Sequence, residues 1–181
     1  MLAAVQPVIK LTNKEDDMRS TAENLQEAFA GESQANRKYL AFAKQAERDG
    51  YLQAARLFRA AAAAETVHAH AHLKAMKGIG TTAENLQEAI DGETHEFTNM
   101  YPDMIKTAED EGNKSAARTL RYANEVEKTH AALYQKMLDS LENPEECDYY
   151  VCSVCGHTQE NEPPEKCPVC GANAKAFFKS E

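Results

Sequence analysis

The chain from residue 21 to residue 140 is rich in alanine and charged residues and poor in glycine and proline, a pattern that favours long helices over strands. Thr21 and Thr82 are suitable helix N-caps, and glycines stand where helices can end in a left-handed residue. These signals predict four helices, near residues 21–48, 51–77, 82–111 and 113–140. Because Pro102 removes a backbone donor inside the third helix, we expect that helix to bend or open locally.

The character of the chain changes after residue 141. Through Asn143 and Pro144 it passes into a segment that contains cysteine and proline and has no helical period. Four helices of the predicted length pack as a bundle. We therefore predict an N-terminal arm at 1–18, a four-helix bundle at 19–142 and a small C-terminal domain at 143–181.

The predicted helices contain an internal repeat. The segment TAENLQEAFAGE at 21–32 returns as TAENLQEAIDGE at 82–93, with ten of twelve positions identical. Farther on, AARLFRAA at 54–61 aligns with AARTLRYA at 116–123. The same pair of helices therefore occurs twice, as a duplicated helical hairpin.

The repeat contains seven residues that could bind metal: Glu32 on the first helix, Glu65 and His68 on the second, Glu93 and Glu96 on the third, and Glu127 and His130 on the fourth. The Glu-x-x-His spacing places both side chains on one helix face. Carboxylates with imidazole suit iron or manganese, and bridging carboxylates can hold two ions close together. Surface pairs that arose by chance are the alternative, but the recurrence of the set in both halves argues against them.

Glu96 departs from the repeat, because its counterpart is Ala35. Such a spare carboxylate can replace an imidazole ligand when the metal is oxidised, since the harder ion prefers anionic oxygen. Tyr39 and Tyr101 follow the ligand carboxylates along their helices, so we predict that either phenol can reach one; core packing is the alternative. His157 is expected on the surface of the C-terminal domain.

The C-terminal segment contains two Cys-x-x-Cys-Gly motifs, which begin at Cys152 and Cys167, with eleven residues between Cys155 and Cys167. Each motif can direct two thiolates at one metal while backbone N–H groups donate to the sulfurs. Four thiolates at this spacing fit either zinc or a single iron. A disulfide pairing is the weakest alternative for a chain in a reducing compartment.

Charge and composition exclude several functions. Twenty Lys and Arg against 29 Asp and Glu give a net charge of -9, which opposes binding to nucleic acid or to an anionic membrane. No apolar run approaches the roughly 20 residues that span a bilayer. The N-terminal stretch lacks the charged region of a secretory signal, so we expect the cytoplasm as the compartment.

Taken together, the chain resembles rubrerythrin in these motifs: Gly31-Glu32-Ser33, Glu65-x-x-His68, Gly92-Glu93-x-x-Glu96 followed by Tyr101-Pro102, Glu127-x-x-His130 and the four tail cysteines. The resemblance implies an all-α ferritin-like four-helix bundle with a small C-terminal rubredoxin-like metal-binding domain. It implies a non-haem di-iron peroxidase that reduces hydrogen peroxide to water. Electrons would reach the carboxylate-bridged iron pair through the rubredoxin-like iron site.

The resemblance also assigns roles to residues. Glu96 and His68 would be alternate ligands of one iron in its oxidised and reduced states, and with Tyr39 and Tyr101 they are the candidate catalytic residues. The remaining metal ligands would be Glu32, Glu65, Glu93, Glu127 and His130 at the iron pair, and Cys152, Cys155, Cys167 and Cys170 at the single iron. An external donor, a rubredoxin or an NAD(P)H-dependent reductase, would supply electrons, as in an NADH peroxidase.

The connection between the second and third helices is short for this fold. Those two helices run parallel in the ferritin-like arrangement, so the chain must return along the bundle between the end of one and the start of the next. At a rise of 1.5 Å per helical residue, this distance is roughly 30 Å. The linker at 78–81 spans at most about 14 Å. We therefore favour a homodimer that exchanges helix pairs over an up-down-up-down bundle.

Two other functions compete with the peroxidase. A ferritin-like ferroxidase would oxidise and bind iron, but it needs neither the spare Glu96 nor the thiolate site. The third possibility is a noncatalytic binding module with a structural zinc site, and the negative charge of the chain disfavours nucleic acid as its partner.

Overall fold

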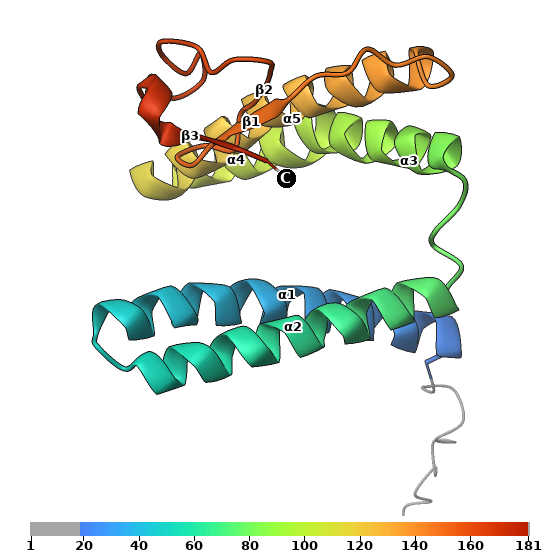
Figure 1. Ribbon diagram of the computed structural model, residues 1–181, viewed down its shortest axis with the longest axis vertical. Helices are drawn as coiled ribbons and strands as arrows, with labels where there is room; N and C mark the ends of the chain where they lie inside the picture. The colour runs from blue at the N-terminus through green and yellow to red at the C-terminus, as the bar shows by residue number, and fades with distance from the viewer. Residues whose placement is uncertain (1–18, 181) are drawn as a thin grey trace, which may run out of the picture. The chain divides into compact units, whose positions relative to one another are not determined.

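Helices α1 (Thr21–Arg48) and α2 (Leu52–Ala75) form an antiparallel hairpin (Figure 1). Five alanines are buried along it: Ala43, Ala46, Ala55, Ala62 and Ala69. Small side chains at a helix contact allow the two axes to approach closely. Asn36 of α1 links the two helices, because its Nδ2 donates to the Ala62 carbonyl at 2.7 Å and to the Thr66 hydroxyl at 2.9 Å.

The computed structural model describes residues 19–180, so the predicted N-terminal arm at 1–18 lies outside the described residues. The described chain divides into two units, 19–79 and 80–180. The first unit is the α1–α2 hairpin, and the second contains the remaining helices and the C-terminal sheet.

The helix caps differ by one residue from the prediction. Ser20 and Thr81, rather than Thr21 and Thr82, are the N-caps of the two repeated helices. Each capping hydroxyl accepts a hydrogen bond from the backbone N–H of a glutamate three residues later, and that glutamate's carboxylate accepts from the N–H of the cap at 2.7 Å. This reciprocal pair of hydrogen bonds requires a hydroxyl three positions before the glutamate. Ser20 and Thr81 lie at that spacing, and Thr21 and Thr82 do not.

The third predicted helix is interrupted by a wider turn. The second unit contains α3 (Thr82–His95), the π-helical turn η1 (Glu96–Met100), α4 (Tyr101–Asp110) and α5 (Lys114–Asp139). Both α3 and α4 pack against α5. The π-turn lies just before Pro102, which cannot donate to the preceding turn, so the predicted local opening is confirmed.

A small antiparallel sheet follows the helices. It consists of β1 (Tyr149–Cys152), β2 (Thr158–Glu160) and β3 (Phe177–Lys179), in the order β2-β1-β3, with the short 3-10 helix η2 (Ala174–Ala176) before β3. Strand β2 packs against α5, as Figure 1 shows. At this contact the Lys136 ammonium donates to both carboxylate oxygens of Glu160, at 2.7 and 2.9 Å.

The predicted helices therefore exist within two residues of their expected outer ends, and the C-terminal segment is a sheet domain rather than a helix. Among residues 19–180, no helix combines the length and the apolar character that crossing a membrane requires.

Candidate metal centres

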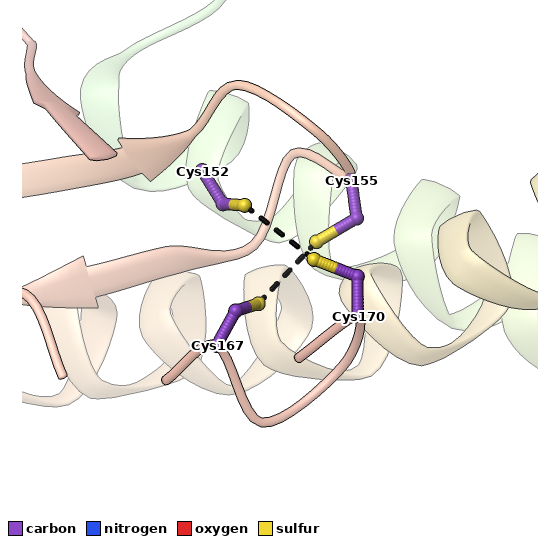
Figure 2. Close-up of side chains that lie close together, drawn as sticks. All are labelled: Cys152, Cys155, Cys167 and Cys170. Carbon is purple, nitrogen blue, oxygen red and sulfur yellow. Dashed lines mark hydrogen bonds between the residues drawn. The ribbon is translucent and has the colours of Figure 1, made fainter. Parts of the chain in front are cut away.

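The four tail cysteines converge on one point in the C-terminal domain (Figure 2). The Sγ atoms of Cys152 and Cys170 are 3.7 Å apart, and those of Cys155 and Cys167 are 3.5 Å apart. A metal bonded at about 2.3 Å to four tetrahedral thiolates requires sulfurs about 3.8 Å apart. The cluster therefore fits a single iron or zinc ion, and all of its cysteines are free thiols.

Two glycines shape the loops that present these thiols. Gly156 and Gly171 have φ values of 88° and 74°, a left-handed conformation that other residues adopt only with strain. The Gly156 N–H donates to the Cys152 carbonyl at 2.8 Å, and the Gly171 N–H donates to the Cys167 carbonyl at 2.9 Å. Each Cys-x-x-Cys-Gly segment thus closes into a tight turn with both sulfurs on its inner side.

The surroundings of the thiols favour a metal. Burial raises the pKa of Cys155 and of Cys170, so these thiols resist ionisation without a cation. Burial acts in the same direction on Cys167, but hydrogen bonds from the backbone N–H groups of Cys170 and Val169 hold its pKa below the ordinary value. Backbone donors directed at sulfur are the ligand environment expected around a thiolate-bound metal.

A second type of cluster occurs once in each unit. In the first unit Glu32, Glu65 and His68 bring one ligand atom each within 4.8 Å of the others, and in the second unit Glu93, Glu127 and His130 do the same. The imidazole Nδ1 contacts the carboxylate of the same Glu-x-x-His motif in both, at 2.9 Å in α2 and 2.7 Å in α5. Each cluster, two carboxylates and an imidazole, suits one half of a carboxylate-bridged iron pair.

Burial and charge repulsion both act on the carboxylates of the second cluster. Burial, followed by the nearby charge of Glu127, raises the pKa of Glu93 to about 7. The Glu93 carboxylate also lies 3.8 Å from Nδ1 of His130. A cation placed among these groups offsets both the repulsion and the loss of hydration, so the donor set fits iron.

Glu96 and Tyr101 stand at the two ends of the π-turn, next to this cluster. Burial and then the charge of Glu127 raise the pKa of Glu96. Burial and then the charge of Glu96 raise the pKa of Tyr101, so the phenol lies close enough to feel the charge of the carboxylates. Tyr39 instead packs in an aromatic group, with ring centroids 6.4 Å from Phe42 and 6.2 Å from Phe58.

Sequence reasoning missed Tyr134. Its pKa is raised by burial and then by the charges of Glu93 and Glu127, so this phenol also lies near the second cluster. The signal was present, because Tyr134 follows His130 by four residues on the same face of α5.

The predicted position of His157 is wrong. The side chain is 6% exposed, and its ring packs edge-on against Phe177 with the centroids 6.4 Å apart. The reason is the fold of the first cysteine loop, in which the Cys152 N–H donates to the His157 carbonyl at 2.9 Å and draws the residue into the domain.

Thr158, the next residue, joins the two kinds of cluster. Its Oγ1 lies 3.0 Å from Nε2 of His130, and Thr158 is three residues beyond Cys155 in the chain. The cysteine domain is therefore bonded directly to a histidine of the carboxylate cluster in the same chain.

Comparison with known proteins agrees with this pair of sites. The Rubrerythrin family profile matches residues 23–138, and the profile described as "Rubrerythrin, rubredoxin-like domain" matches residues 150–178. Rubrerythrin-2 of Clostridium acetobutylicum is 38% identical over 174 residues, which cover 87% of this chain and 95% of that protein. Nigerythrin of Nitratidesulfovibrio vulgaris is 36% identical over 165 residues, 83% of this chain and 82% of its own length.

Solved structures give the same result for the fold. The fully reduced, all-ferrous state of nigerythrin matches 99% of this chain and 100% of its own, with a TM-score of 0.55 and 32% identity. The predicted fold class, helical with a small C-terminal metal-binding domain, is confirmed. The chain belongs to the rubrerythrin family of oxidoreductases, which have a di-iron site and a rubredoxin-like iron site.

Proposed function

We propose that this protein is a non-haem di-iron peroxidase that reduces hydrogen peroxide to water and protects against oxidative stress. The reaction is H2O2 + 2e− + 2H+ → 2H2O, and an iron pair, when bound, supplies the two electrons. The four-cysteine site restores them one at a time from an external donor, a rubredoxin or an NAD(P)H-dependent reductase acting as in an NADH peroxidase.

The contact between the cysteine domain and α5 supports this function most directly. The hydrogen bond between His130 and Thr158 and the ion pair of Lys136 with Glu160 both join the cysteine domain to the helix that carries Glu127 and His130. Neither iron storage nor simple ferroxidation needs an electron carrier at this position.

We propose that the iron pair is held by the two clusters together with Glu96, and that the single iron is held by the four cysteines. The complete set is Glu32, Glu65, His68, Glu93, Glu96, Glu127 and His130 for the pair, and Cys152, Cys155, Cys167 and Cys170 for the single iron. Glu96 and His68 exchange as ligands of one iron as its charge changes. In this proposal the boundary between the helical domain and the cysteine domain lies between residues 142 and 143.

The phenols have a separate role in the proposal. The raised pKa of Tyr101 keeps its proton in place at neutral pH, so the hydroxyl can donate a hydrogen bond towards the carboxylates or the substrate. We propose the same role for Tyr39, which occupies the equivalent position in the first repeat, 62 residues before Tyr101.

Each unit contains only half of the ligand set, so we propose that the halves combine in a homodimer that exchanges helix pairs. Backbone bonds from Met76, Lys77 and Gly78 tie these residues to the last turn of α2. Residues 78–81 then span at most about 14 Å, against the roughly 30 Å that parallel α2 and α3 require. A reducing compartment such as the cytoplasm suits four cysteines kept as thiolate ligands.

Anaerobic stopped-flow absorbance of the fully reduced protein tests the activity. It is mixed in parallel with stoichiometric hydrogen peroxide and with dioxygen. A peroxidase reoxidises both iron chromophores rapidly with peroxide and much more slowly with dioxygen. Preference for dioxygen would instead identify the alternative, a ferritin-like ferroxidase, and a tail without iron absorbance would exclude the proposed electron route.

A variant of Glu96 sharpens the test. Glu96→Ala installs the residue that the first repeat has at this position, Ala35. Peroxidase turnover should fall at least about 10-fold, the low end of the effect of lost ligand-shell groups, whereas ferroxidation should change less. The matched control is Glu88→Ala, an exposed glutamate of α3 outside the cluster, which should react like the unmodified protein.

A further inference from the structure

The two ring nitrogens of His130 face different groups. Its Nδ1 lies 2.7 Å from the Glu127 carboxylate and 3.8 Å from that of Glu93, on the side where the carboxylates gather. Its Nε2 lies 3.0 Å from the hydroxyl of Thr158, on the opposite side of the ring. The imidazole therefore bridges the carboxylate cluster and strand β2.

The hydroxyl of Thr158 has a second partner. Its Oγ1 also lies 3.4 Å from the carbonyl of Gly156, the glycine that closes the first cysteine loop. A hydroxyl has one proton and two lone pairs. When it donates that proton to Gly156, its oxygen is left to accept a hydrogen bond from Nε2–H of His130.

This direction of bonding matters for a metal. A histidine binds a metal through an unprotonated nitrogen, and the hydrogen bond of the other nitrogen sets which one that is. With its proton on Nε2, His130 presents the Nδ1 lone pair to the space between Glu93 and Glu127. A cation in that space takes the place of a proton between Nδ1 and the carboxylates.

The surroundings of Nε2 make the hydroxyl important. A cavity of about 390 Å³ borders His130 and Thr158, and its apolar lining residues are Leu86, Leu133, Met137 and Val151. Without the hydroxyl, the Nε2 proton would lose its protein acceptor and face a largely apolar lining. The ion pair between Lys136 and Glu160 keeps β2, and with it Thr158, at this position.

We propose that Thr158 is a positioning residue for His130: its hydroxyl fixes the ring as an Nδ1 ligand and links the first cysteine loop to that ligand within a single chain. The inference rests on the proposed metal role of His130. Every contact in it lies within residues 80–180, so each four-cysteine site is connected to the half-site of its own chain, whichever copy supplies the other half.

The test compares two substitutions in the full-length protein. Thr158→Val keeps the shape of the side chain and removes the hydroxyl, and Thr158→Ser keeps the hydroxyl. Anaerobic titration with Fe2+ measures affinity at the carboxylate site, while the visible absorbance of the four-cysteine iron reports that its domain remains folded. Thr158→Val should weaken Fe2+ binding about 10-fold or more, and Thr158→Ser should restore it.

A spectroscopic measurement separates positioning from general stability. In the protein loaded with Zn2+, long-range 15N NMR identifies which nitrogen of His130 is protonated. The unmodified protein and Thr158→Ser should show Nε2–H with zinc at Nδ1, and Thr158→Val should lose this single state. Thr119→Val, an exposed threonine of α5, is the control for a threonine-to-valine change and should match the unmodified protein.

The outcomes distinguish this inference from the proposed function. If His130 in the unmodified protein does not respond to zinc, both the proposed ligand set and the role of Thr158 are wrong. If His130 responds to zinc equally with and without the hydroxyl, or if Ser and Val weaken Fe2+ binding equally, the role of Thr158 alone is overturned and the peroxide reaction is unaffected.

Discussion

Lys136 of α5 and Glu160 of β2 form a two-pronged ion pair, with Nζ 2.9 and 2.7 Å from the two carboxylate oxygens. The two residues are 24 positions apart in the chain, so this pair joins the cysteine domain to the helix that presents Glu127 and His130. Its importance is in orientation, since ion pairs with exposed partners stabilise proteins by only about 0–1 kcal/mol.

The first prediction follows from that pair. Lys136→Met should slow electron transfer from the four-cysteine site to the iron pair by several-fold, because β2 is held less firmly, while the free energy of unfolding falls by no more than about 1 kcal/mol. Single-turnover absorbance and urea denaturation measure the two quantities. Lys128→Met is the control, because Lys128 pairs with Glu125 within α5 itself; equal slowing in both variants would contradict the prediction.

The second prediction concerns pH and Glu93 in the metal-free protein. Its pKa is raised in the folded chain to about 7, from an ordinary value of 4.5. The folded state therefore binds the proton more tightly than the unfolded state, so the stabilisation is complete below pH 4.5 and is lost as the pH rises through about 7. Urea denaturation between pH 5 and 8 should show this decline in the unmodified protein.

Glu93→Gln should remove that part of the decline, because an amide does not titrate in this range. The control is Glu88→Gln, an exposed residue of the same helix, which should keep the decline of the unmodified protein. If the Glu93→Gln variant lost stability with pH as steeply as the unmodified chain, Glu93 would not be the titrating group.

The third prediction concerns the glycines of the cysteine loops. Gly156→Ala and Gly171→Ala place a side chain at φ values of 88° and 74°, at a cost of roughly 1–2 kcal/mol each. The loops should then release metal to a chelator faster, which the decay of the thiolate absorbance measures. Gly31→Ala is the control, because Gly31 is helical with no atom within 4 Å of the added carbon, and it should be neutral or stabilising.

The fourth prediction tests the corrected helix caps. Thr81→Ala removes the hydroxyl that accepts from the Glu84 N–H, and should lower the free energy of unfolding by about 1 kcal/mol. Thr82→Ala changes the first residue inside α3 and should have a much smaller effect. If denaturation showed the reverse order, the cap would be at Thr82, as the sequence pattern alone predicted.

The fifth prediction concerns assembly. Inserting about 12 glycine and serine residues between Gly80 and Thr81 lengthens the connection enough for one chain to complete both halves of the site. Light scattering should then show a shift from dimer to monomer with the iron content unchanged. The same insertion after Gly50, in the α1–α2 turn, should leave a dimer; monomers for the unmodified protein would refute the exchange of helix pairs.

Local features were predicted correctly from the pattern of residues. The four helices, the opening near Pro102 and the two Glu-x-x-His pairs depend on neighbours three to five positions away, which a repeat displays directly. The convergence of four thiols also follows from short motifs, because each Cys-x-x-Cys-Gly turn orients its own pair of sulfurs. The predicted N-caps were wrong by one residue because Ser20 and Thr21 both have a hydroxyl, and the prediction did not use the spacing to Glu23, which selects Ser20.

Other features depended on contacts between distant parts of the chain. The bond between His130 and Thr158 joins residues 28 positions apart, and the burial of His157 depends on how the first cysteine loop folds against Phe177. No local pattern encodes such contacts, because the first arises only when β2 packs on α5 and the second only when the cysteine loop and β3 come together. The amino-acid sequence therefore specified the candidate ligands and their helices, and the packing of the sheet on α5 determined which groups surround His130.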